Sequence, residues 1–242
     1  MATSLTTMLL YALTPTLIMI GGGAIAAWKP PGAGLRGVIL HIAAGIVFSV
    51  VAVELLPDIV RLHAPWEVAL GFGGGVMTML LIRRLIEKSE TGGQRSQGVL
   101  PIGMLLGVAV DLVIDGLLLG IGFAAGAKEG VLLTLALAAE VLSLSLAIST
   151  QLRQEQFTPI RVVGIVAALA GVFYLAALSG VTLLRSLSGN LLEIVLSFGL
   201  AALLFLVTEE LLVEAHEEKE TPLMTASCFG GFLLFLLLGM LG

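Results

Sequence analysis

Long apolar runs alternate with short polar breaks along the whole of this 242-residue chain. A helix needs about 20 mostly apolar residues to cross about 30 Å of bilayer hydrocarbon. Runs of that length lie at residues 5–28, 37–57, 68–86, 100–125, 131–150, 162–184, 191–213 and 223–241. The pattern predicts an all-α integral membrane protein with eight transmembrane helices, in which residues 1–242 form a single transmembrane domain.

The composition agrees with a membrane protein. Charged residues make up 12% of the chain and hydrophobic residues 58%, and the mean hydropathy is +1.09. Soluble proteins carry about 25% charged residues. The net charge of −5 does not favour nucleic-acid binding, which calls for a basic patch. We therefore expect a multi-pass protein of a prokaryotic plasma or inner membrane, with the lipid bilayer as a partner and no nucleic acid.

The basic residues predict an orientation. Lys and Arg concentrate in or beside the breaks after the first, third, fifth and seventh runs: Lys29, Arg36, Arg83, Arg84, Lys88, Arg95, Arg153, Arg161 and Lys219. The other breaks hold Arg61, Lys128 and Arg185. Because cytoplasmic loops carry the excess of Lys and Arg, this split predicts that both termini lie outside.

Three carboxylates interrupt the fourth and fifth apolar runs. Asp111 and Asp115 are four residues apart, so they lie one turn apart on one helix face, and Glu140 lies in the next run. A carboxylate near the bilayer centre costs about 2.5–3.5 kcal/mol on insertion scales, so such groups usually face a protein-lined pathway. Together with Ser143, three residues after Glu140, they predict an all-oxygen site for a divalent cation. In the alternative interpretation, the acids are neutral and hydrogen-bonded and only tie helices together.

Further ionisable residues lie near the ends of the second and seventh runs. Glu54 is either a ligand that collects cations at the outer mouth or a solvated charge at the membrane interface. Glu209 and Glu210 predict a cytoplasmic exit point, to which His216 adds a nitrogen ligand of the kind zinc-like ions accept. The alternative is an acidic helix end that continues into solvated residues.

Two other residues of the second run carry simpler expectations. His41 stands among small apolar residues, so we expect a packed, hydrogen-bonded side chain rather than a ligand. Pro57 predicts the end of the second helix.

Three stretches resemble the Zrt/Irt-like (ZIP) family of metal transporters. Residues 48–57 are similar to the second span of that family, which often ends in a His-Leu-Leu-Pro-type segment. Residues 206–216 are similar to its Glu-rich seventh span, and 111–116 fall where its fourth span usually reads His-Asn-x-x-Glu/Asp-Gly. The resemblance covers the whole chain. It implies a ZIP-like bundle in which spans one, four, five and six slide against the other four.

The sequence departs from the family pattern at the metal ligands. Asp111 and Leu112 replace the histidine and asparagine of the fourth span, while Asp115 keeps the acidic position. In the fifth span Glu140 keeps one acid, Ser143 falls near a usual carboxylate, and the usual proline is absent. The two-metal centre that the resemblance implies is thus reduced to about one site without imidazole.

These observations predict a membrane transporter that moves a divalent metal cation, of the zinc, iron or manganese class, into the cytoplasm as its substrate, and that needs no cofactor. Residues 71–75 lack the Gly-Lys-Ser/Thr ending of a nucleotide-binding loop, and we expect no enzyme activity. The alternatives are a ZIP-like fold with a changed, proton-coupled or non-metal substrate, and a metal-binding sensor without transport. A homodimer stays open as an assembly.

Overall fold

The computed structural model describes residues 5–90, 100–184, 187, 189–216 and 221–241, and every regular element in them is helical. The elements are α1 (Leu5–Trp28), α2 (Ala33–Val50), η1 (Val51–Leu55), α3 (Leu56–Leu62), α4 (Pro65–Glu90), α5 (Ile102–Ala125), α6 (Ala127–Gln154), α7 (Pro159–Leu184), α8 (Asn190–Leu206), η2 (Val207–Leu211), α9 (Leu212–His216) and α10 (Pro222–Leu241). Eight of the resulting helices are long and apolar enough to cross a membrane, which confirms the number expected from the hydropathy pattern.

The second and seventh spans are interrupted by one turn of π-helix each, η1 and η2. Each interrupted span continues beyond its π turn, as α3 and as α9. The expectation that Pro57 ends the second helix is therefore wrong. Pro57 lies in the first turn of α3, where proline is tolerated because the backbone N–H groups of a first turn need no partner within the helix.

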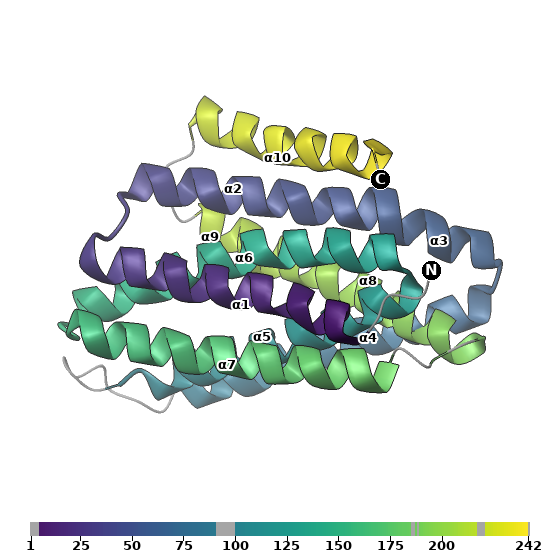
Figure 1. Ribbon diagram of the computed structural model, residues 1–242, viewed down its shortest axis with the longest axis horizontal. Helices are drawn as coiled ribbons and strands as arrows, with labels where there is room; N and C mark the ends of the chain where they lie inside the picture. The colour runs from purple at the N-terminus through teal and green to yellow at the C-terminus, as the bar shows by residue number, and fades with distance from the viewer. Residues whose placement is uncertain (1–4, 91–99, 185–186, 188, 217–220, 242) are drawn as a thin grey trace.

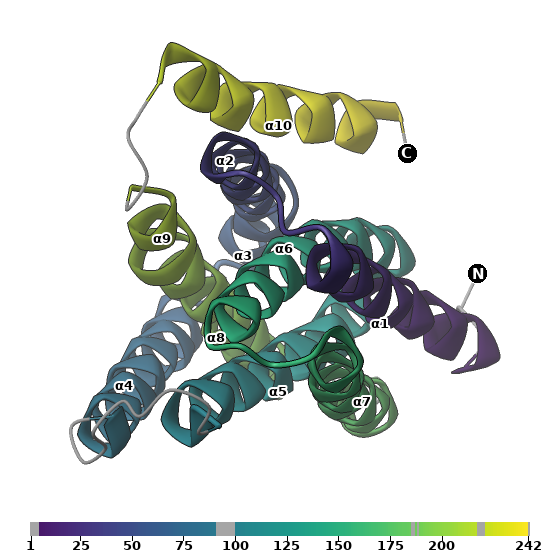
Figure 2. The ribbon, with the colours of Figure 1, turned by 90° about the vertical axis from the view of Figure 1, so that its left-hand side faces the viewer.

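The spans form one elongated bundle (Figure 1). α1 begins and α10 ends at the same end of the bundle as α3, which we call the α3 end; α9 lies toward the opposite end, the α9 end. Viewed along the bundle, α6 runs through the middle, and α4 and α10 lie at the periphery (Figure 2). Burial agrees with this view, since the spans of α2 and α6 are the most buried and those of α4 and α10 among the least.

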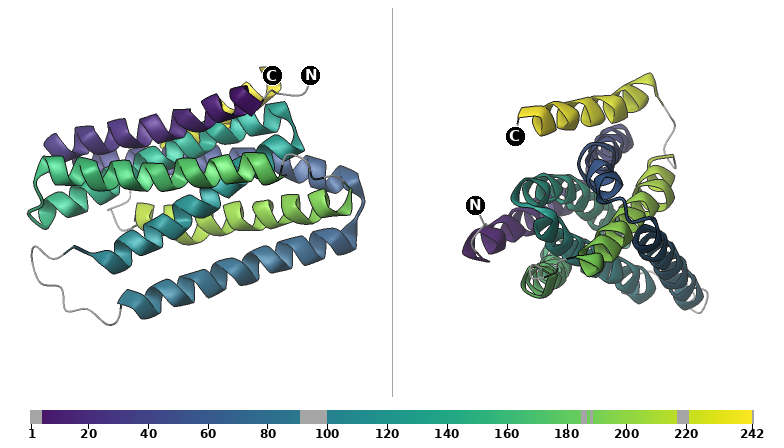
Figure 3. Two further views of the ribbon diagram at one scale, coloured as in Figure 1. Left: turned by 60° about the horizontal axis from the view of Figure 1, so that its bottom comes forward. Right: turned by 90° about the vertical axis from the view of Figure 1, so that its right-hand side faces the viewer.

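Helix packing divides the bundle into one four-helix body and two helix pairs. The four helices α1, α5, α6 and α7 pack extensively on one another, and we call them body I. The remaining spans form the pairs α2–α10 and α4–α8, and the latter two helices run side by side in Figure 3. η1 contacts α8 and η2 contacts α2, and these contacts connect the two pairs.

Glycines bring backbones into direct contact inside each of these units. A Cβ on Gly120 of α5 would clash with the backbone of Gly180 in α7. Equivalent contacts join Gly45 of α2 to Cys228 of α10, and Gly71 of α4 to Ile194 of α8. Small residues that allow such close approach are the usual basis of helix association in lipid, where the hydrophobic effect between helices is absent.

The interface between body I and the α4–α8 pair is looser. A Cβ on Gly199 of α8 would lie 3.2 Å from Leu118 Cδ2 and 3.3 Å from Ile121 Cγ2, both on α5. These neighbours are side-chain tips rather than backbone, so this contact can adjust more easily than the contacts inside each unit.

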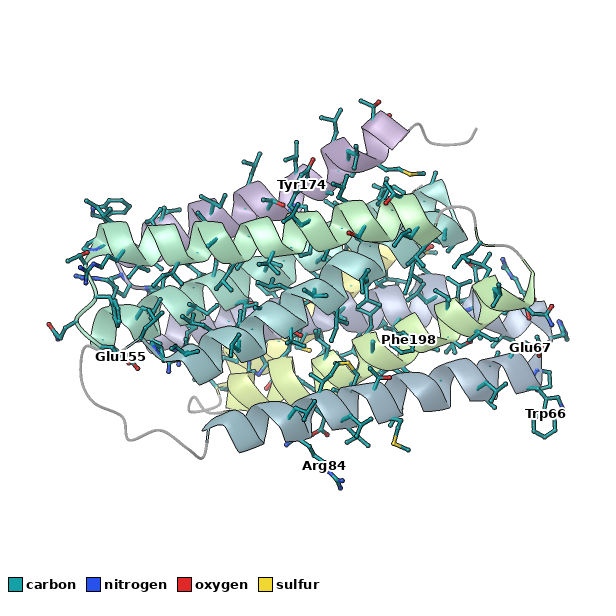
Figure 4. The ribbon with its side chains drawn as sticks, turned by 90° about the horizontal axis from the view of Figure 1, so that it is seen from below. Trp66, Glu67, Arg84, Glu155, Tyr174 and Phe198 are labelled. Carbon is teal, nitrogen blue, oxygen red and sulfur yellow. The ribbon has the colours of Figure 1, made fainter. Side chains whose placement is uncertain are left out.

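The exposed tryptophans fit a bilayer. Trp28 is the last residue of α1 and Trp66 the second residue of α4, and their exposed fractions are 65% and 78%. In Figure 4, Trp66 and Arg84 point away from the bundle, Trp66 at one end of α4 and Arg84 toward the other. Tryptophan is enriched at both membrane interfaces, where its ring sits among the lipid headgroups.

The close contact of α5 and α7 makes Gly120 sensitive to substitution. We expect Gly120→Ala to lower the free energy of unfolding by about 1–3 kcal/mol, because the added methyl group forces two backbones apart. Gly171→Ala on α7 is the matched control, since a Cβ there meets no atom within 4 Å among the described residues. Thermal or denaturant unfolding in detergent followed by circular dichroism measures both. Equal effects of the two substitutions would contradict the role given to this contact.

Candidate metal centre

Three carboxylates from two neighbouring helices of body I meet inside the bundle. Asp111 and Asp115 come from α5 and Glu140 from α6. One carboxylate oxygen of each residue lies within 4.8 Å of the others. The structure thus brings together the three acids that the sequence singles out.

The packing of α5 fixes which way these acids point. Gly116 follows Asp115 directly, and a Cβ on Gly116 would lie 2.6 Å from both Ala176 Cβ and Ala177 N of α7. This contact sets the rotation of α5 against α7. Successive helical residues are about 100° apart, so the Asp111–Asp115 face turns away from that contact and toward α6.

The cluster is shielded from solvent. Asp115 is fully buried, Glu140 is 2% exposed, and Asp111 is half-buried. Three carboxylates this close repel one another when charged, and a cation between them would offset that repulsion. The arrangement is therefore chemically suited to hold a cation.

The spacing of the oxygens suits a divalent ion. Ligand oxygens lie about 2.0–2.6 Å from Mg²⁺, Mn²⁺-sized or Ca²⁺ ions, so two oxygens on opposite sides of an ion are about 4–5 Å apart. The 4.8 Å limit in the cluster falls in this interval. All three donors are carboxylate oxygens, which suit harder cations better than thiolate or imidazole sites do.

Ser143 is buried on α6, the helix that carries Glu140. Its hydroxyl donates a hydrogen bond to the carbonyl oxygen of Glu140 at 2.6 Å. The hydroxyl hydrogen is thus used within the helix, while the oxygen keeps its lone pairs. A role of Ser143 as a ligand stays a prediction.

Burial along α5 is uneven on the two sides of the cluster. The structure describes all of α5, and no residue from Ile102 to Asp111 in it is buried. Beyond Asp115, toward the α3 end, Gly116 and residues 118–123 are all buried. The packing is therefore tighter between the cluster and the α3 end than between the cluster and the α9 end.

Glu54 lies at the α3 end and is not an open mouth ligand in this structure. It belongs to the π turn η1 and is 7% exposed, so the alternative of a solvated interfacial charge is wrong. Its Oε1 lies 3.7 Å from the ammonium nitrogen of Lys128, the second residue of α6. The same ammonium donates a hydrogen bond to Gly239 O of α10 at 2.8 Å.

The residues expected at the exit lie at the opposite end. Glu209, in η2, is 43% exposed and pairs with Arg83 of α4. Glu209 is not part of the carboxylate cluster. The side chains of Glu210 and His216 lie outside the described part of the structure, so their predicted roles stay untested.

The structure also shows partners that the sequence analysis missed. From the sequence, Lys128 and Arg83 count only as basic residues near the ends of spans. In the structure each forms an ion pair with a glutamate on another span. One signal was available for Lys128: a cation in the first turn of a helix is unfavourably placed toward the helix dipole and needs another reason to be there. His41 is as expected, since it is buried and its Nδ1 donates a hydrogen bond to Gly37 O at 2.7 Å.

Comparison of the chain with protein-family models and with curated proteins finds no match.

The cluster makes metal binding testable. We expect purified protein to bind Mn²⁺, and Asp115→Asn to weaken binding at least about tenfold, or about 1.4 kcal/mol, because one charged ligand is lost. Binding should also weaken as the pH falls from about 7.5 to 5.5, since protons compete with the ion for carboxylate ligands. Competition binding at both pH values measures these effects. Asp58→Asn, at the α3 end beside Arg61, is the matched control and should leave the affinity unchanged. Affinity that ignores both pH and the Asp115 change would contradict a metal site here.

Proposed function

We propose that this protein is a ZIP-like membrane transporter that moves a divalent metal cation into the cytoplasm through Asp111, Asp115 and Glu140. The observation that carries the proposal is the convergence of these three carboxylates, buried or half-buried, on two neighbouring membrane-spanning helices. Ionisable residues in such positions usually mark an ion or substrate pathway.

The resemblance to ZIP transporters adds independent support. It rests on residues 48–57, 111–116 and 206–216 and on the number of spans. No family model or curated relative that matches the chain adds to it. Two of the three segments coincide with features that depart from a regular helix: 48–57 contains η1 and 206–216 contains η2. Single π turns inside α-helices occur frequently at functional sites.

The packing supports a mechanism in which body I moves as a unit. Both helices that carry the carboxylates belong to body I, so the cluster would travel without changing its own geometry. Backbone contacts such as Gly120 against Gly180 hold body I together, whereas Gly199 meets α5 through side-chain tips. Sliding of body I against the two helix pairs would then expose the cluster to one end of the bundle and to the other in turn.

The oxygen-only ligands favour harder divalent ions. Zinc usually binds a given nitrogen, oxygen or sulfur site more tightly than manganese or ferrous iron does. Imidazole and thiolate ligands favour zinc most, so a site without them gives zinc a smaller advantage in affinity. Asp111, Asp115 and Glu140 supply neither ligand type. We therefore propose Mn²⁺ and Fe²⁺ as substrates alongside Zn²⁺, with a smaller advantage for zinc than a histidine-containing site would give.

The orientation assigns the α9 end to the cytoplasm, because the breaks rich in Lys and Arg lie at that end. Cysteine labelling tests this in a Cys228→Ser background. We expect Trp66→Cys to react with a membrane-impermeant maleimide added outside intact cells, and Arg84→Cys to react after permeabilisation. Both side chains are exposed, Trp66 at one end of α4 and Arg84 toward the other. Reaction of both positions from the same side would refute this topology.

Transport itself is tested by flux. Proteoliposomes that contain the protein should accumulate Mn²⁺, detected by a dye inside, at rates at least about tenfold above those of Asp115→Asn, the minimum loss expected from the affinity change. Glu155→Gln, at the C-terminal end of α6 and outside the cluster, should transport at the wild-type rate. Metal binding with no flux would replace the transporter by the sensor alternative, and absence of both would remove metal as the substrate.

A further inference from the structure

Lys128 connects three helices at the α3 end. It is the second residue of α6, in body I, and its ammonium contacts two elements of the α2–α10 pair. The hydrogen bond to Gly239 O is 2.8 Å long, and the distance to Glu54 Oε1 is 3.7 Å. The Lys128 side chain therefore crosses the interface between body I and a neighbouring unit.

The position of Lys128 is unfavourable for its own helix and favourable for α10. A cation in the first turn of a helix opposes the helix dipole, whereas a cation at a helix C-terminus is stabilised by it. Gly239 is among the last four residues of α10, whose carbonyl groups have no partner within the helix. Lys128 thus caps the C-terminus of α10, and its placement is explained by contacts across the interface rather than by contacts within α6.

The Glu54 carboxylate lies directly against the backbone of Gly239. A Cβ on Gly239 would lie 2.6 Å from Glu54 Oε1. Glu54 is 7% exposed, and the charges of Asp58 and Glu129 act on it as well as that of Lys128. A carboxylate buried among other acids depends on a nearby cation, because removing its partner leaves an uncompensated buried charge.

We propose that Lys128, Glu54 and Gly239 form a latch that holds body I against the α2–α10 pair and keeps the α3 end of the bundle closed. The latch rests on the movement of body I in the proposed function, and it holds whichever ion is transported. When body I slides, Lys128 leaves Glu54 and Gly239 O, and the α3 end opens.

Another pair at the same end provides a contrast. Asn190 of α8 donates a hydrogen bond to Glu67 Oε1 of α4 at 2.9 Å. Both residues belong to the α4–α8 pair, so this contact persists when body I moves. Glu67→Gln is therefore the control: it makes the same chemical change as Glu54→Gln at the same end of the bundle, and it leaves the latch intact.

The reporter for opening is a cysteine at the interface near the α3 end. Ile121 of α5 is 5% exposed and packs against Gly199 of α8, so a thiol at this position is shielded while the bundle is closed. We would place Ile121→Cys in the Cys228→Ser background, reconstitute the protein in nanodiscs with a chelator present, and measure the rate of modification by a charged methanethiosulfonate.

Release of the latch should speed this modification. We expect Lys128→Met and Glu54→Gln each to raise the rate about tenfold, corresponding to about 1.4 kcal/mol in the opening equilibrium. The double variant Glu54→Gln/Lys128→Met removes both charges together, so its faster rate cannot come from a buried charge that unfolds the protein. Glu67→Gln should react at the parent rate.

Two results would overturn the latch. One is a parent-like rate in Lys128→Met and in the double variant; the other is an equal acceleration by Glu67→Gln, which would indicate general loosening. Because the assay contains no metal, its outcome is separate from that of the transport proposal. Acceleration without metal flux would support the latch and refute transport of that metal, and flux with an unchanged rate would support transport and refute the latch.

Discussion

The exclusion of water from the bilayer interior is the constraint on which this structure depends. A buried charge there must meet an opposite charge, a proton or an ion, because solvent does not stabilise it. Glu54 meets this requirement through Lys128, a cation from another unit of the bundle. Asp111, Asp115 and Glu140 bring three carboxylates together, an arrangement that a bound cation would stabilise.

The same constraint shapes the helix packing. Association of helices in lipid relies on close contact and on hydrogen bonds, because lipid chains are as apolar as leucine. Backbone contact at glycines joins α5 to α7, α2 to α10 and α4 to α8, while α8 meets α5 through side-chain tips. Tight association within these units and looser contact of α8 with α5 gives a bundle in which that interface is able to shift.

The sequence carries the features that depend on local spacing. Span number follows from the length of apolar runs, and the common face of Asp111 and Asp115 follows from helix periodicity. The approach of Glu140 to that face was inferred from the cost of isolated buried charge and lies in the structure as expected. Each of these features is predictable because it depends on the sequence of a single helix or on one general energetic rule.

Features that depend on tertiary packing could not be predicted in this way. Glu54 pairs with Lys128 because the N-terminus of α6 lies beside the C-terminus of α10. The two residues in contact there, Lys128 and Gly239, are 111 positions apart in the sequence. Pro57 has the sequence character of a helix end, and the π turn before it changes that outcome. Ser143 follows Glu140 by three residues, and the hydrogen bond from its hydroxyl to the Glu140 carbonyl oxygen is a local bond that the ligand spacing did not indicate.

The two π turns also mark where the chain length is able to vary. Both have the sequence Val-x-x-Glu-Leu, at 51–55 and 207–211. A π turn accommodates one more residue than an α turn, so deletion of one residue there would leave a continuous α-helix. Because the π turn absorbs that extra residue, the helix beyond it would keep its orientation after the deletion. A one-residue deletion at either turn should accordingly disturb the packing of α3 or α9 less than a deletion inside a regular α-helix, where everything beyond it rotates by about 100°.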